Sequence, residues 1–193
     1  MIQLPPSLQI AGGLNLIKNL HYQLDPSFRY PIEVRHHSWF NELFYNYIKE
    51  KYYCLVWSQQ DIVITPPVVT TDFVYLRLIG DRSIDEKDFG KINKDRTKEM
   101  EIWSKILEDD DRKVKDLNMA IIAANNHYAG FGPMIAKLFA EMMNLKDHIR
   151  SFPILNYKSN YNETLGNEDK ENYRLYRQQY SKPRQTDISE FFK

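Results

Sequence analysis

Short apolar segments alternate with helical patterns through the first 145 or so residues, and this order constrains the fold more than any other feature. The expected strands cover residues 31–35, 53–57, 73–80 and 118–126, and the expected helices cover 38–52, 86–109 and 132–144. Short strands without a polar face, separated by helices, are typical of a parallel sheet that is buried on both faces. The sequence therefore predicts an α/β fold with about four parallel strand–helix units.

Two details support the helical assignments. Ser38 is expected to cap the helix over 38–52, because a serine oxygen accepts a hydrogen bond from a free N–H of the first turn. Pro133 stands where the first turn of a helix accepts proline.

The composition changes after about residue 150. Tyrosines, charged residues and amides dominate there, and aliphatic residues are few, which favours disorder. We therefore expect a folded domain over 1–150, a polar linker or tail over 151–184 and a separate terminal segment over 185–193.

The charge balance limits the partners. Lys and Arg together number 26, as do Asp and Glu, so the formal net charge is zero. A protein that holds DNA mainly through phosphates needs a concentrated positive surface, so we expect contact with DNA to be indirect. The chain shows no signal peptide and no membrane-length apolar run, and we expect a cytoplasmic protein without membrane contact.

Polar residues follow the predicted strands where each of them ends. The candidate catalytic residues at these ends are Glu33, Arg35, His36, Arg77, Asn125 and Asn126. The carboxyl ends of parallel strands share one rim, which is where such sheets place their sites. Arg35 and Arg77 suit an anion clamp, and Glu33 or His36 suits acid/base chemistry.

A structural interpretation of the same residues stays open. Glu33 and the arginines can simply neutralise one another, and the two asparagines can cap the following helix. No ligand spacing such as HExxH is present, so we predict no metal site, and no glycine-rich phosphate motif occurs. The cofactor, if any, stays open.

Four segments occur in order: IQLPPSL, YPIEVRHHSWF, FVYLRLIGDRS and ANNHYAGFGPMIAKLF. They resemble the second half of the YecE-like family, a domain-of-unknown-function family (number seventy-two) with a TIM-barrel-like fold. The resemblance covers residues 1 to about 145. It implies that Trp39 and the six candidate residues line the mouth of a barrel.

The chain also departs from that family. Ile79 stands where the family usually has a histidine, which weakens the expectation of intact chemistry, and Ala124 replaces a phenylalanine. The first half of the family's pattern is absent, whereas a (β/α)8 barrel takes ~250 residues. Three explanations stay open: a fragment, a split-gene product that pairs with a separate chain supplying the missing half barrel, or two associating copies. A half barrel by itself leaves two unpaired sheet edges and an uncovered inner face.

The last nine residues, QTDISEFFK, resemble the PCNA-interacting motif (PIP box) of replication and repair proteins. Gln185, Ile188, Phe191 and Phe192 match its defined positions. In one helical turn the three apolar side chains share a face and form a compact plug. The resemblance implies that a PCNA sliding clamp is the partner.

These features lead to three functional hypotheses. The first is a clamp-binding protein whose barrel-like domain acts on a nucleotide or another phosphate-bearing substrate in DNA replication or repair. The second is a non-catalytic adaptor or clamp competitor. The third is a metabolic barrel enzyme whose tail matches the motif by accident.

Overall fold

The computed structural model describes residues 1–60, 63–113 and 117–145. Its contacts divide the chain into a unit over Met1–Met143 and a second unit over Asn144–Lys193, and only the first is described below. The expected linker over 151–184 and the terminal motif over 185–193 lie outside the described residues.

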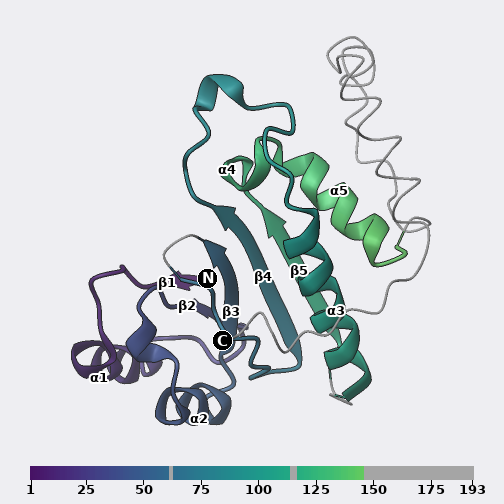
Figure 1. Cartoon of the computed structure of the whole chain (residues 1–193). Helices are drawn as coiled ribbons and strands as arrows, with labels where there is room; N and C mark the ends of the chain where they lie inside the picture. The colour runs from purple at the N-terminus through teal and green to yellow at the C-terminus, as the bar shows by residue number, and fades with distance from the viewer. Residues whose placement is uncertain (61–62, 114–116, 146–193) are drawn as a thin grey trace. The chain divides into compact units, whose positions relative to one another are not determined.

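A single parallel sheet forms the centre of the first unit (Figure 1). It contains five strands in the order β1-β2-β3-β4-β5. Their bounds are β1 Ile2–Gln3, β2 Pro31–Glu33, β3 Cys54–Gln60, β4 Phe73–Gly80 and β5 Met119–Ala124. This confirms the parallel α/β prediction, with one strand, β1, that the sequence pattern did not reveal.

Helices connect most of these strands. The α-helices are α1 Ile10–His21, α2 Glu42–Glu50, α3 Thr97–Lys113, α4 Asn126–Ala129 and α5 Gly132–Met142. Single 3₁₀ turns occur at His37–Trp39 and Glu86–Asp88. Figure 1 shows α3 and α5 running beside β4 and β5. No helix connects β3 to β4 among the described residues.

The start of α2 corrects one expectation. Asn41, not Ser38, caps this helix: its Oδ1 accepts a hydrogen bond from the Phe44 N–H at 3.1 Å. Ser38 lies in the preceding 3₁₀ turn, and its hydroxyl oxygen accepts from the Ile10 N–H at 3.0 Å. It therefore anchors the first residue of α1, a helix that the sequence pattern did not predict. Pro133 does lie in the first turn of α5, as predicted.

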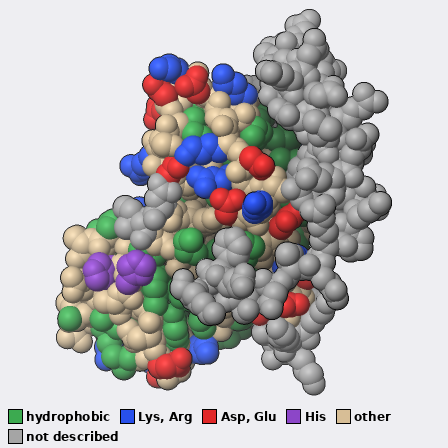
Figure 2. Space-filling view, in the orientation of Figure 1, with side chains coloured by type: hydrophobic (Ala, Val, Ile, Leu, Met, Phe, Trp, Pro, Cys, Tyr) green, Lys and Arg blue, Asp and Glu red, His purple; other side chains and the backbone are tan. Residues whose placement is uncertain are grey.

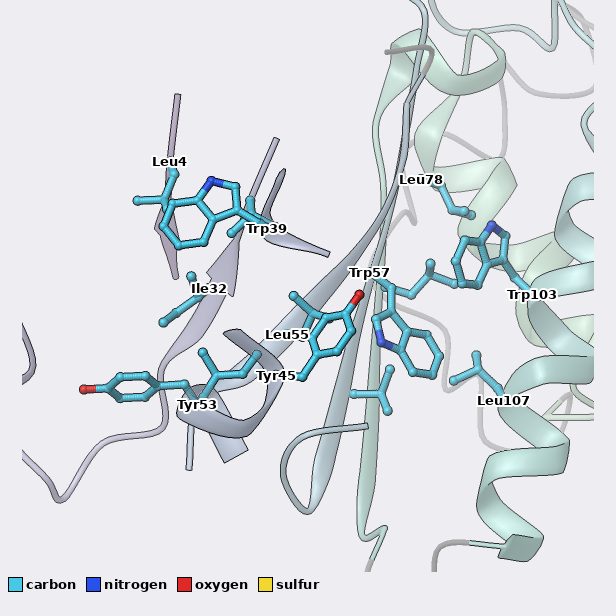
Figure 3. Close-up of a cluster of buried hydrophobic side chains, with 14 of the residues drawn as sticks. Leu4, Ile32, Trp39, Tyr45, Tyr53, Leu55, Trp57, Leu78, Trp103 and Leu107 are labelled. Carbon is cyan, nitrogen blue, oxygen red and sulfur yellow. The ribbon is translucent and has the colours of Figure 1, made fainter. Parts of the chain in front are cut away.

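The core lies on the face of the sheet that carries Leu55, Trp57, Leu76 and Leu78, all at most 1 % exposed. Figure 3 shows Trp57 next to Trp103 of α3. Their rings are stacked, with centroids 5.9 Å apart. Burial of such large side chains provides most of the stabilisation of a domain of this size.

The last strand differs from the prediction. We expected the strand over 118–126 to be buried on both faces, but Met119 and Ile121 of β5 are 40 % and 37 % exposed. The reason is topological, because β5 is the terminal strand of the sheet. No further strand among the described residues pairs with its outer edge, and the exposed Met119 and Ile121 lie on one face of the strand.

Candidate functional site

Side chains from β1, β2 and β4 meet at the carboxyl end of the sheet. Gln3 pairs with Glu33 in register, so both side chains point to the same face. Arg35 follows Glu33 by two residues and shares that face. Arg77 of β4 reaches across β3 to the same point, because β2 and β4 both flank β3. The sequence prediction that Glu33, Arg35 and Arg77 lie together is therefore confirmed.

Glu33 is the centre of this cluster and is fully buried. Its Oε1 accepts a hydrogen bond from Arg35 Nε at 2.8 Å, and its Oε2 is paired with Arg77 Nη1. The Gln3 Oε1 accepts from Arg35 Nη2 at 2.9 Å and from Arg77 Nη1 at 3.4 Å. Both carboxylate oxygens are thus occupied, and Glu33 holds the two guanidinium groups in place.

The cluster has an unused capacity for anions. One carboxylate faces two guanidinium groups, so its net charge is +1. The arginine side chains are 17 % and 21 % exposed. Each guanidinium carries five N–H donors, and among the described residues Arg35 uses two of them, while Arg77 uses only those on Nη1. Figure 2 shows basic and acidic side chains side by side where β4 ends.

His36 does not join this cluster through any hydrogen bond among the described residues. Its Nδ1 accepts a hydrogen bond from the Ser38 N–H at 3.1 Å and lies 2.9 Å from the Ser38 hydroxyl. A backbone N–H can only donate, so the proton of the neutral ring is on Nε2. The ring therefore caps the 3₁₀ turn through Nδ1, and the predicted acid/base role of His36, which in this geometry falls to Nε2, stays a prediction.

Asn125 and Asn126 also have local roles. Asn125 Oδ1 accepts from the His127 N–H at 2.9 Å and begins α4. Asn126 Oδ1 accepts from the Gly132 N–H at 2.8 Å and so fixes the start of α5. Both oxygens therefore accept hydrogen bonds from backbone N–H groups that follow β5. This matches the alternative, left open by the sequence, that the two asparagines cap the following helix.

Ile79 lies where the resemblance predicts a histidine, and it is buried. The next residue, Gly80, has a φ of +81°, and a Cβ there would lie 2.3 Å from the carbonyl oxygen of His127. Glycine therefore lets the end of β4 approach α4 closely. Ile79 thus contributes an apolar side chain to this end of the sheet, where a histidine would contribute an imidazole.

A second ionic cluster follows β4, and the sequence prediction missed it. Asp81 Oδ2 pairs with Lys94 and lies 3.3 Å from Arg96 Nη2. Its Oδ1 accepts two hydrogen bonds from Ser83. The side-chain hydrogen bonds from Lys94 and Ser83 hold the pKa of Asp81 well below its ordinary value of 3.8.

Arg96 in this second cluster uses three of its five N–H donors, one of them toward Asp81. Its Nε donates to the Tyr128 carbonyl oxygen at 3.1 Å and its Nη1 to Glu99 at 3.1 Å. The guanidinium also lies 5.5 Å from the centre of the Tyr128 ring, and burial raises the pKa of that phenol. A signal for this cluster was present in the sequence, because Asp81 directly follows a predicted strand.

Comparisons with known proteins identify a family and a fold. A family model described as "Protein of unknown function DUF72" matches residues 1–155. A search of curated proteins found no match.

Two solved structures are similar in fold. A DUF72 family protein from Thermotoga maritima has 20 % sequence identity and a TM-score of 0.58, and the match covers 74 % of this chain and 56 % of that one. A DUF72 family protein from Enterococcus faecalis V583 has 16 % identity and a TM-score of 0.56, over 77 % of this chain and 60 % of that one. The chain thus spans less than two thirds of the length of these solved structures.

Proposed function

The chain belongs to the DUF72 family of proteins of unknown function, and on that premise we propose that its domain binds a phosphate-bearing ligand, such as a nucleotide, between Arg35 and Arg77. The observation that carries this proposal is the buried Glu33, which holds two partly exposed guanidinium groups side by side. Guanidinium donors bind phosphate with charge-assisted, often bidentate hydrogen bonds. Because Glu33 already orients both groups, little side-chain entropy is lost when an anion binds.

The geometry favours binding over any particular reaction. Both oxygens of Glu33 are in ion pairs, and His36 Nδ1 caps a turn. Neither group is therefore placed as a free general base. The proposal accordingly assigns the two arginines to ligand binding and Glu33 to their positioning.

A calorimetric titration of the full chain with inorganic phosphate and with adenosine monophosphate tests this proposal. Arg77→Lys keeps the positive charge beside Glu33 but loses the planar guanidinium, which can bind an anion through two N–H groups at once. We expect this variant to weaken binding at least about tenfold. The matched control is Arg29→Lys, because Arg29 pairs with Asp72 just before β4, at the opposite end of the strand. The absence of binding by the unmodified chain, or an equal loss in both variants, would refute the proposal.

We also propose that the terminal motif recruits the chain to a PCNA-type sliding clamp, so that the domain works in DNA replication or repair. The support is the sequence pattern alone, namely Gln185, Ile188, Phe191 and Phe192. Three apolar side chains on one helical turn suit an apolar pocket on a partner. Recruitment by a clamp is also compatible with the zero net charge of the chain, because the partner then provides the contact with DNA.

Titration of a clamp ring with the full chain and with the Phe191→Ala/Phe192→Ala variant tests this second proposal. We expect roughly micromolar binding by the unmodified chain, because ordering the segment has an entropic cost. The double variant should show no measurable binding. Equal binding by the two proteins would instead favour a metabolic enzyme with an accidental match. Binding to the clamp without anion binding at Arg77 would favour the adaptor.

We further propose that a separate chain supplies the remaining strands of the barrel. The sheet is open, with β1 and β5 as its edges, and Met119 and Ile121 of β5 expose apolar area. Two copies of this chain would bring ten strands to an architecture of eight, which favours a different partner chain over a second copy. A chain with about three parallel strand–helix units does.

Native mass spectrometry of the protein isolated from its source tests this partner. We expect a one-to-one complex whose second chain has the predicted strand–helix pattern, together with slow hydrogen exchange at the β5 amides. A monomer or a homodimer in which these amides exchange rapidly would contradict the proposal.

A further inference from the structure

Two hydroxyl groups that the site described above does not use lie near the end of β3: Ser58 belongs to the strand, and Thr65 belongs to the segment that follows it. After β3, residues 63–65 fold back along the strand, with an antiparallel bridge between Gln59 and Ile64. The Thr65 N–H donates to the Ser58 carbonyl oxygen at 3.0 Å. Residues opposite each other in an antiparallel pair point to the same face. The side chains of Ser58 and Thr65 are therefore neighbours.

That face is the one that carries the arginine cluster. Ser58 pairs in register with Arg77 of β4, and side chains paired in this way lie on the same side of a parallel sheet. Arg77 must cross β3 to reach Glu33 on β2. Its side chain therefore passes over the end of β3, where the two hydroxyl groups are.

Both hydroxyl groups are buried without a partner. Ser58 and Thr65 are fully buried, and neither Ser58 Oγ nor Thr65 Oγ1 has a hydrogen-bond partner among the described residues. Buried hydroxyl groups are normally satisfied, because leaving one unpaired has a free-energy cost. Two such groups next to each other, beside a cationic cluster with free donors, are placed to donate hydrogen bonds to an anionic ligand.

We propose that Ser58 and Thr65 donate hydrogen bonds to the same phosphate group that Arg35 and Arg77 bind, which makes the site selective for a tetrahedral phosphate over a planar carboxylate. This inference rests on the proposed function. A carboxylate has two oxygens in one plane, and two guanidinium groups can occupy both of them. A phosphate has a further oxygen outside that plane. The hydroxyl groups of Ser58 and Thr65, at the end of β3, are suited to donate hydrogen bonds to that oxygen.

Titrations of the full chain with inorganic phosphate and with acetate test the inference. Ser58→Ala and Thr65→Val should each weaken phosphate binding by about fivefold to tenfold, as expected for one lost hydrogen bond, and leave acetate binding unchanged. Thr65→Ser keeps the hydroxyl and should retain phosphate affinity. Thr71→Val is the matched control, because the Thr71 hydroxyl already donates to the Phe73 carbonyl oxygen before β4 begins.

The stability of the ligand-free chain provides an independent readout. Removing an unpaired buried hydroxyl should leave the unfolding midpoint unchanged or raise it, whereas Thr71→Val should lower it. Wild-type phosphate affinity in both Ser58→Ala and Thr65→Val would overturn the inference. If Arg77→Lys still weakened anion binding in that case, the proposed function would stand. If the unmodified chain bound neither anion, both would fail.

Discussion

Two carboxylates near the carboxyl end of the sheet each lie between two cations, yet the two clusters differ in what they leave free. Glu33 is fully buried between Arg35 and Arg77, whose remaining N–H donors have no partner among the described residues. Asp81 is 14 % exposed between Lys94 and Arg96, and the guanidinium of Arg96 is already bound to a carbonyl oxygen and a second carboxylate. The first cluster therefore keeps a net charge of +1, whereas Glu99 brings the second one to zero. We call the first cluster open and the second closed, because only the first has a positive charge that no carboxylate balances.

The largest expected effect comes from removing the buried charge. Glu33→Gln should lower the free energy of unfolding by about 3 kcal/mol, because two guanidinium groups then lose their buried counter-ion. Thermal or denaturant unfolding measures the change. Glu50→Gln is the matched control, since Glu50 is exposed and pairs with its neighbour Lys51, and it should leave the free energy of unfolding nearly unchanged. Equal losses in the two variants would contradict the role assigned to Glu33.

A smaller effect is expected at the closed cluster. Asp81→Asn should lower the free energy of unfolding by about 1 kcal/mol, because the pairs with Lys94 and Arg96 are partly exposed. Phosphate binding should stay unchanged, because no free donor at this cluster is proposed to bind the ligand. A tenfold loss of phosphate affinity in Asp81→Asn, measured by calorimetry, would contradict the claim that only the Glu33 cluster binds phosphate.

The smallest effect is a dependence on pH. The pKa of Asp81 is lowered from 3.8 in the folded chain, so the unfolded chain binds this proton more readily. The stabilisation by Asp81 is therefore complete above about pH 4 and is lost as the pH falls further. The stability difference between the unmodified chain and Asp81→Asn should shrink over that acid range in urea titrations. A difference that stays constant down to pH 2 would contradict the assigned pairing.

The sequence predicted the parts of the fold that local pattern determines. β4 was predicted with its observed bounds, and β5 and α5 were close to theirs, because apolar runs and a first-turn proline are local signals. The meeting of Glu33 with Arg77 followed from a general rule on parallel strands. These agreements concern the framework and the position of the rim.

The parts that were missed depend on tertiary contacts. Helix α1 contains Gly12 and Gly13, which lower its helical propensity. A Cβ on Gly13 would lie 2.4 Å from the Trp39 ring, so the glycine serves close packing that no local pattern reveals. The hydrogen bonds of His36 and Asn126 with nearby backbone N–H groups exist only once their loops are folded. The pairing of Asp81 with Lys94 joins residues that are 13 positions apart in the sequence.

The most direct test of the open and closed clusters is an NMR titration of the arginine Nε–H resonances with inorganic phosphate. We predict that the signals of Arg35 and Arg77 shift in a saturable manner, while the signal of Arg96 does not move. Stationary signals for Arg35 and Arg77, or an equal shift at Arg96, would contradict the claim that Glu33 holds two guanidinium groups ready for an anion.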